Sequence, residues 1–254
     1  MPNPRLLKLA ERWKNPEPPK DRPSSINKPK PKVRLNQQYS FLEDKLAQDI
    51  HNYIQSTYPN LPNLENINPG EGSNPFYVIT VNDYFRANKS PIRTASPFDL
   101  EQALKSGIEL KRHYEDSALT LRNTKNPNKY LAKDLAGQLK ATNYPLMISL
   151  KGLTLIKDSK SPHNYSFKLT DETEIIYSDK LKRGNNIKKF NETDEHGLPI
   201  FDYQGTRTFY TRDSGLSRVC LGGDLGLDSN VGNVADSNSG GRVVLVSGEA
   251  ANFS

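Results

Sequence analysis

The side chains best suited to covalent or metal chemistry are few in this chain, and their spacing does not bring them together. A single cysteine, Cys220, excludes an internal disulfide framework and every zinc site built from several cysteines. A nucleophilic Cys220 would need a histidine folded beside it, and the spacing of the four histidines implies none (His51, His113, His163 and His196). We therefore expect a protein that is not an enzyme, with no catalytic residue, no metal site and no cofactor.

Aspartate, asparagine and glycine recur at short steps between residues 222 and 241, a pattern typical of loops that bind calcium through oxygen ligands. The stretch GGDLGLDSN resembles a Gly- and Asp-rich nonapeptide repeat, but its glycine pair stands one residue too far from the second aspartate. The stretch DSNVGNVADSNSGG lacks the glycine and the final glutamate of an EF-hand loop. A calcium-binding, Gly- and Asp-rich β domain stays an alternative.

The C-terminal part of the chain differs in composition from the rest. Residues 205–248 contain no Lys, Glu, Gln, Met or Trp, and they hold nine of the sixteen glycines. Between residues 220 and 240 a sparse frame consists of Leu221, Leu225, Leu227, Ser229, Val234, Ala235, Ser237 and Ser239. The frame alternates with a second set of positions: Cys220, Gly222, Gly223, Asp224, Gly226, Asp228, Asn230, Val231, Gly232, Asn233, Asp236, Asn238 and Gly240. Every residue of the second set has a codon that arises from AAC or AAT by changing adenines alone, and the five missing residue types have none.

The stretch SGLSRVCLGGDLGLDSNVGNVADSNSGGRVVLVSGEA resembles the variable region of target proteins of diversity-generating retroelements. In that family, mutagenic reverse transcription rewrites adenines, and the altered side chains bind changing ligands on a rigid scaffold that is often C-type-lectin-like. The resemblance covers about residues 205–250 and implies that the thirteen positions of the second set contact ligand. It also implies that GGRVVLVS is the invariant β-strand that ends such a domain. The Trp-rich turn common in lectin-like members is missing, since the only tryptophan is Trp13.

Positive charge is concentrated at the N-terminal end. Residues 1–35 carry ten Lys or Arg against three acidic residues, a net charge of +7, so the other residues carry −1 of the total of +6. Six prolines between residues 15 and 35 predict a linker, and the whole basic tail is predicted to be disordered. Residues 6–13 have the spacing of a short basic amphipathic helix, which is marginal alone; the alternative is a docking motif or phosphate-contacting arm. Sequence-independent, weak contact of this tail with nucleic acid is a second alternative. No apolar run is long enough for a membrane span or a signal peptide, so we expect a cytoplasmic protein.

Helical spacing dominates the middle of the chain. Apolar residues recur at three- and four-residue steps over 41–57, behind a capping box of Ser40 and Glu43. The run FYVITV over 76–81 predicts a strand. Ser96 and the residues after it predict an N-cap for a helix that continues to Leu121, and a third helix is predicted over 128–141.

Short runs of alternating or β-branched residues follow Pro145 and predict strands, with a hairpin tip at residues 203–205 and a central strand over 243–246. The segment KLKRGNNIKKFNETDEHG between them predicts a solvated loop. Its alternative is an anion site formed by Lys180, Lys182, Arg183, Lys188 and Lys189.

Together these patterns predict an α+β protein, and the resemblance implies a C-type-lectin-like C-terminal part. We expect a tail over 1–35, a helix-rich region over 36–144, and a β-rich ligand-display domain over 145–254 with its variable region at about 214–247. The expected function is non-enzymatic binding through a hypervariable surface, with a variable protein or surface ligand as the partner.

Overall fold

The computed structural model describes residues 37–183 and 188–248. The chain divides into residues 1–34 and a compact unit of residues 35–254, to which all described residues belong. The predicted basic tail and its short helix lie outside the described residues. The nucleic-acid alternative, which depends on that tail, therefore stays a prediction.

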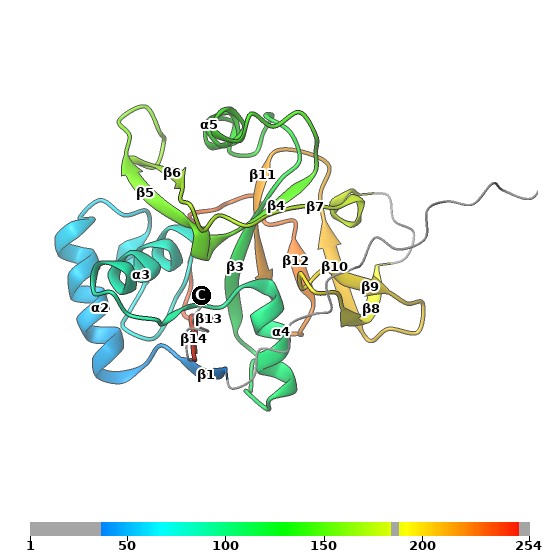
Figure 1. Cartoon of the computed structure of the whole chain (residues 1–254), viewed down its shortest axis with the longest axis horizontal. Coiled ribbons are helices and arrows are strands. Elements are labelled where there is room, and N and C mark those ends of the chain that lie inside the picture. Colours follow the sequence, from blue (N-terminus) through cyan, green and yellow to red (C-terminus); the bar gives the residue numbers. More distant parts are fainter. Residues whose placement is uncertain (1–36, 184–187, 249–254) are drawn as a thin grey trace, which may run out of the picture. The chain divides into compact units, whose positions relative to one another are not determined.

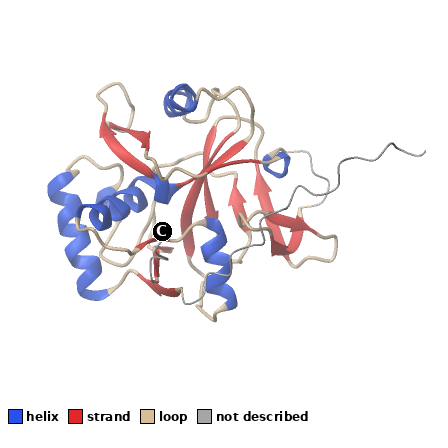
Figure 2. Cartoon of the chain, in the orientation of Figure 1, coloured by secondary structure: helices blue, strands red, loops and turns tan. Residues whose placement is uncertain are grey.

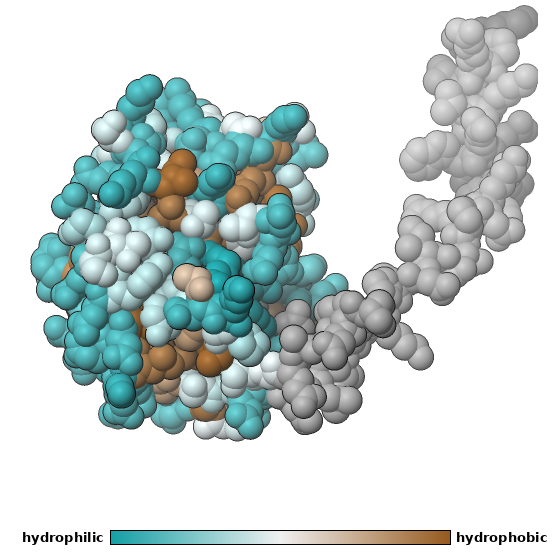
Figure 3. All heavy atoms as spheres, turned by 60° about the vertical axis from the view of Figure 1, so that its left-hand side comes forward, coloured by the Kyte–Doolittle hydropathy of each residue, from teal (hydrophilic) through white to brown (hydrophobic). Residues whose placement is uncertain are grey.

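The compact unit is an α+β fold. Its helices are α2 (Asp44–Thr57), α3 (Pro75–Ala87), α4 (Pro97–Lys105) and α5 (Lys129–Leu139), with the short 3-10 turns η1 (Leu64–Asn66), η2 (Leu150–Gly152) and η3 (Asp179–Leu181). Figure 2 shows α2 and α3 on the side of the unit away from β8 (Lys189–Thr193) and β9 (Pro199–Phe201). Figure 3 brings the α2 side forward, and polar residues cover most of that face, with apolar residues in separate patches.

A nine-stranded sheet forms the centre of the unit, in the order β7-β4-β3-β11-β12-β10-β8-β9, and β13 pairs with β3 (Figure 1). Its other strands are β3 (Tyr114–Leu121), β4 (Leu146–Ser149), β7 (Ile175–Tyr177), β10 (Arg207–Thr211), β11 (Leu216–Leu221), β12 (Leu227–Ser229) and β13 (Gly241–Arg242). A smaller sheet contains β1 (Gln38–Phe41), β14 (Val244–Ser247) and β2 (Arg93–Thr94), with β14 in the middle, where a central strand is predicted. The strands β5 (Leu153–Lys157) and β6 (Tyr165–Leu169) form a separate pair.

The helices with local capping signals match their predictions best. α4 begins after the predicted N-cap, Ser96, which forms a capping box: Ser96 Oγ accepts the Asp99 N–H (3.3 Å), and Asp99 Oδ2 accepts the Ser96 N–H (2.9 Å). α5 and most of α2 are also observed. The predicted capping box of α2 is wrong, because Ser40 belongs to β1 and Glu43, at the N-cap, makes no side-chain cap bond.

The predicted strand over 76–81 is wrong, because these residues form the first half of α3. Asn74 caps that helix by accepting the Tyr77 N–H at 2.9 Å, and Pro75 occupies its first turn. Every residue from Pro75 to Asn82 is buried, so the helix lacks the polar stripe that would distinguish it from a buried strand.

The predicted continuation of α4 to Leu121 is also wrong. Gly107 has a φ of 92°, a left-handed conformation that suits the end of a helix, and α4 stops at Lys105. Residues 114–121 form β3, which lies between β4 and β11 and is buried over nearly its whole length. A strand covered on both faces loses the two-residue alternation that identifies strands in sequence.

The boundary drawn at residue 144 does not separate two compact units. β3, from the region predicted to be helix-rich, pairs with β11 and β4 from the β-rich region. One hydrophobic core includes Ile50 of α2, Val78 of α3 and Leu216 of β11. The helices and the sheet therefore fold around a shared core.

Two details between residues 178 and 211 also differ from prediction. The segment predicted to be a solvated loop contains η3 and β8. The turn containing Tyr203, which is 78% exposed, does not join a hairpin, since β9 and β10 each pair with β8.

Candidate functional site

The predicted ligand-contact positions fall on one stretch of chain, residues 220–240, which we call the display segment. It begins at the end of β11, turns through residues 222–226, forms β12 and then crosses to β13 without regular structure. β12 pairs antiparallel with β11, with Cys220 opposite Asp228. Gly222 N–H donates to Gly226 O at 2.7 Å and closes the turn between the two strands.

Groups outside the display segment hold its backbone. Carbonyl oxygens of the segment accept hydrogen bonds as follows: Gly223 from Arg112 N–H (2.9 Å), Leu225 from Arg207 (2.6 Å), Asn230 from Arg212 (2.9 Å), Val231 from Arg218 N–H (3.2 Å), Gly232 from Asn128 (2.5 Å), Ala235 from Asn63 (2.7 Å) and Asn74 (3.2 Å), Asp236 from Arg218 (3.0 Å), Ser239 from Arg242 (2.7 Å) and Gly240 from Tyr114 N–H (3.0 Å). The course of the segment is thus set largely by residues that are not among the thirteen.

Tyr114, at the start of β3, fixes the last part of the segment. Its hydroxyl accepts the Asn238 N–H at 3.1 Å and donates to Ser73 O at 2.9 Å. The Ser73 N–H donates in turn to Ser237 Oγ at 3.1 Å. This chain of bonds joins the display segment to the residues just before α3.

The side chains of the frame and of the second set differ in exposure. Five of the eight frame residues are buried: Leu221, Leu227, Ser229, Val234 and Ala235. Six of the thirteen predicted contact positions are exposed: Gly223, Asp224, Asn230, Asn233, Asp236 and Asn238. Five others are half-buried: Gly222, Asp228, Val231, Gly232 and Gly240.

Two of the thirteen positions do not belong to an exposed surface, and we correct the predicted set accordingly. Cys220 is 3% exposed, and burial raises the pKa of its thiol well above the ordinary value, so the side chain is neither accessible nor reactive. Gly226 is buried, and an added Cβ would lie 2.8 Å from Thr208 O. Cys220 is buried because its strand, β11, lies between β3 and β12, and Gly226 is buried because β10 packs against it.

Some displayed side chains also stabilise their own turns. Four of them accept the backbone N–H two residues further on: Asp224 from Gly226 (2.9 Å), Asp228 from Asn230 (2.7 Å), Asn233 from Ala235 (3.1 Å) and Asn238 from Gly240 (2.9 Å). Asn and Asp both make this turn, and Ser makes it more weakly. Exchange among these residue types therefore preserves the local backbone.

A buried charged layer lies beneath the segment. Arg218 of β11 covers the Tyr114 ring at 4.8 Å and lies 3.6 Å from Asp116 Oδ2. Asp116 also accepts the Ser73 hydroxyl at 3.0 Å; burial raises its pKa, and Arg218 and Ser73 act in the opposite direction. Beside it, burial first and then the Asp116 charge raise the pKa of Glu115 to about 9. Both Glu115 carboxyl oxygens are buried without a hydrogen-bond partner in the described part of the chain, and Glu115 is protonated at neutral pH.

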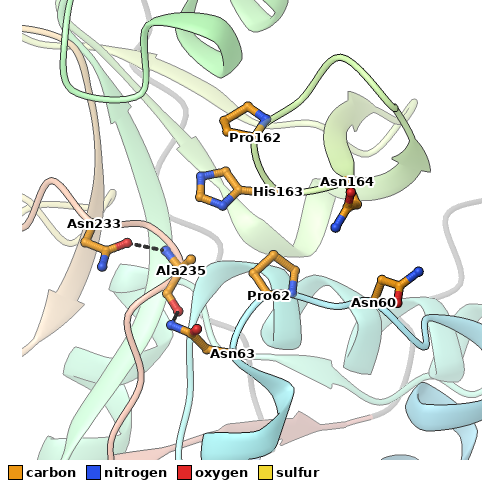
Figure 4. Close-up of a pocket in the computed structure, with 8 residues that line it drawn as sticks. All are labelled: Asn60, Pro62, Asn63, Pro162, His163, Asn164, Asn233 and Ala235. Carbon is orange, nitrogen blue, oxygen red and sulfur yellow. Dashed lines mark hydrogen bonds between the residues drawn. The ribbon is translucent and has the colours of Figure 1, made fainter.

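A pocket of about 360 Å³ adjoins the display segment (Figure 4). Three loops meet around it, and its lining residues are Asn60, Pro62, Asn63, Pro162, His163, Asn164, Asn233 and Ala235. None of these residues carries a formal charge except a protonated histidine, and burial lowers the pKa of His163, whose ring packs 5.2 Å from that of Phe76. The pocket thus suits an uncharged polar group better than an ion.

Sequence reasoning missed the residues that anchor the segment and most of those that line this pocket. Asn63 and Asn128 are 172 and 104 positions away from the residues whose carbonyls they bind. The one local signal is conformational: both have positive φ, 53° and 58°, which asparagine tolerates better than most residues. That signal is not visible in sequence.

Within residues 37–183 and 188–248, no three His, Cys, Asp or Glu side chains are placed to hold a metal ion together. Calcium binding has no carboxylate cluster to support it there, and it stays a prediction. Among the same residues, no helix combines the length and apolar character needed to cross a membrane.

Comparison of the chain with protein-family models, with curated proteins and with solved structures gives no match. The resemblance of the C-terminal stretch to retroelement target proteins therefore rests on its own residues.

Proposed function

We propose that this protein is a non-enzymatic binding protein whose display segment presents diversified side chains to a changing ligand, as targets of diversity-generating retroelements do. The lectin-like topology that the resemblance implies is part of the proposal. The contact set consists of the eleven exposed or half-buried positions, without Cys220 and Gly226. The ligand is a protein or another surface, bound without covalent chemistry.

One observation supports this proposal above the others: the carbonyls of the display segment are held by residues outside the contact set. Arg212, Arg218, Asn128, Asn63 and Tyr114 contact backbone atoms, which every residue type carries. A binding surface can change its side chains only if its backbone is stable without them. Five of the eight frame residues are buried, so the frame also stabilises the segment from positions outside the contact set.

The surface of this copy is small and polar. Four of the contact positions are glycines: Gly222, Gly223, Gly232 and Gly240. The negative charges of the surface come from Asp224, Asp228 and Asp236. Tight interfaces usually depend on buried aromatic or arginine side chains, and the contact set contains none. We expect this variant to bind weakly, and other variants of the same scaffold to bind more tightly.

Two matched libraries test the proposal. The first randomises Gly223, Asn230 and Asp236 and varies Asp224, Asn233 and Asn238 among Asn, Asp and Ser, which keep their turns. The second randomises the five buried frame residues of the same segment. Sorting for protease resistance should leave most members of the first library folded and few of the second. Selection of the first library against a panel of proteins should then yield specific binders. A first library that mostly unfolds, or folds but yields no binder, would refute the proposed function.

A further inference from the structure

Arg122, directly after β3, is a buried cation without an anionic partner. The residue is 6% exposed, and its guanidinium donates to four neutral acceptors: Leu181 O (3.0 Å), Ser217 Oγ (2.7 Å), Thr211 Oγ1 (2.7 Å) and Ser229 Oγ (2.6 Å). Among the described residues, no carboxylate oxygen lies within 4.0 Å of this guanidinium to form an ion pair. The hydroxyls orient the charge but do not neutralise it.

Burying such a charge is costly. Removing an ion from water costs several kcal/mol in proteins unless a counter-charge compensates, and hydroxyl groups provide only dipoles. The effect is visible in the pKa of Arg122, which burial and then the nearby Arg212 charge lower to about 10, while Asp213 and Asp228 oppose the shift. An anion beside Arg122 would therefore stabilise the fold.

A cavity of about 270 Å³ opens beside Arg122 and could receive such an anion. Its walls include Tyr144 and Pro145, and Lys182, Arg183 and Asp213 complete the lining. The lining residues carry three positive charges and one negative, a sum of +2; Asp179, which pairs with Lys182 from outside the lining, lowers this to +1. The volume is below the roughly 300 Å³ at which pockets for drug-sized ligands begin, which favours a small ion or a single charged group.

The cations at this cavity are available to a ligand. Lys182 pairs with Asp179 and Arg183 with Asp213, and in both pairs the side chains are more than half exposed, at 56% and 85% and at 62% and 63%. Exposed ion pairs contribute little, so they can exchange partners at small cost.

Part of the anion site considered from sequence is at this cavity and part is elsewhere. Lys182 and Arg183 line it. Lys180 instead pairs with Asp194 at 2.6 Å, and Lys189 donates to Thr208 at 2.9 Å. The buried cation of the cavity, Arg122, directly follows β3 and is far from the basic segment in sequence, so that segment gave no indication of it.

We propose that this cavity binds a phosphate group, either inorganic phosphate or the end of a phosphomonoester, with Lys182 and Arg183 contacting its oxygens and Arg122 supplying the buried positive charge. A tetrahedral anion with one or two negative charges complements the positive charge of this cavity, and guanidinium groups bind phosphate through paired N–H donors. The site is separate from the contact set and does not depend on the proposed display function.

Calorimetric titration of the full chain with inorganic phosphate, at constant ionic strength set with chloride, tests the site. The Lys182→Ala/Arg183→Ala double variant should weaken binding at least about tenfold, which corresponds to about 1.4 kcal/mol. The control double variant Lys133→Ala/Lys168→Ala removes the same charge from two exposed positions elsewhere and should bind as the unaltered chain does. Arg122→Met, once circular dichroism shows that it is folded, should abolish binding.

Titration with phosphoserine separates the two sources of the group: tighter binding than phosphate indicates a phosphomonoester, and equal binding indicates the free ion. If neither ligand produces heat or raises the melting temperature of the unaltered chain, the proposal is wrong. It is also wrong if both double variants lose binding equally, since the effect would then come from overall charge.

Discussion

β3 and the display segment are neighbours that are stabilised in opposite ways. Residues 116–122, most of the strand and Arg122 after it, are all buried. β3 pairs with β11 from Glu115 to Leu121 and with β4 from Ala118 to Leu121. The display segment has little regular structure, and side chains from distant parts of the chain hold its carbonyls. In β3 the identity of each side chain should decide stability. In the display segment the backbone should matter and most side chains should not.

The largest effect should come from the strand. Leu119 is completely buried in the shared core, so Leu119→Ala should lower the free energy of unfolding by about 3 kcal/mol through the lost apolar contacts and the cavity left behind. Urea denaturation measures the change. Ile200→Ala, at a position 48% exposed, is the control and should cost far less. Equal losses at both positions would contradict the assignment of β3 to the core.

Glu115 makes the strand sensitive to pH. A glutamate ionises near pH 4.3 in an unfolded chain, and burial raises its folded pKa to about 9, so between these values the folded protein holds one more proton. The contribution of Glu115 to the free energy of unfolding therefore falls as pH rises, by up to about 1.4 kcal/mol per pH unit.

Urea denaturation at pH 6 and pH 8 should therefore show lower stability at pH 8, and Glu115→Gln should flatten the dependence because glutamine stays neutral. Glu192→Gln, at an exposed position, should leave the dependence unchanged. If Glu115→Gln behaves as that control does, Glu115 is not protonated in the folded protein.

An anchor residue should show an intermediate effect. Asn128 donates to Leu216 O at 2.7 Å and to Gly232 O at 2.5 Å, so Asn128→Ala leaves two carbonyls without these donors and should cost about 1–2 kcal/mol. Hydrogen exchange should quicken most in the display segment around residues 230–234. Asn143→Ala, at an exposed position, should change neither quantity. An unchanged exchange rate in the segment would mean that the anchor does not hold it.

The smallest effects should come from the displayed side chains. Asn230 and Asp236 are exposed, and their bonds to the rest of the protein are made through backbone atoms. Asn230→Ala and Asp236→Ala should each change the free energy of unfolding by less than about 0.5 kcal/mol. Thermal denaturation of both variants sharpens the comparison: a loss close to that of Asn128→Ala would erase the difference between anchors and displayed residues.

The same contrast explains what could be predicted from sequence. The start of α4 is local, since Ser96, Pro97 and Asp99 lie within one turn, and it was predicted correctly. The first half of α3 is buried on all sides, so its apolar run carries no periodicity that separates helix from strand. β3 is almost entirely buried although it begins with Tyr, Glu, Asp and Ser, so its sequence lacks the regular alternation of a half-buried strand. The predicted α+β class is nevertheless correct, because it depends on many elements together and not on these two.

In the display segment, the alternation of small polar residues with Leu and Val is visible in sequence and matches the exposure of most positions. The exceptions depend on neighbours outside the segment: Cys220 pairs with Asp116 of β3, and Gly226 lies against Thr208 of β10. The anchors Asn63, Asn74 and Asn128 could not be predicted, because each acts on a carbonyl more than a hundred residues away.

The most direct test of diversified display is to sequence the DNA around the gene. The proposal predicts a nearby reverse transcriptase and a near-copy of the 3′ end that differs only where the copy has adenine. The differences should fall on codons of the contact set and spare those of Arg212, Arg218 and Leu227, which hold or support the segment. A complete genome without such a copy, or a copy whose differences fall on the anchor codons, would contradict the proposed function.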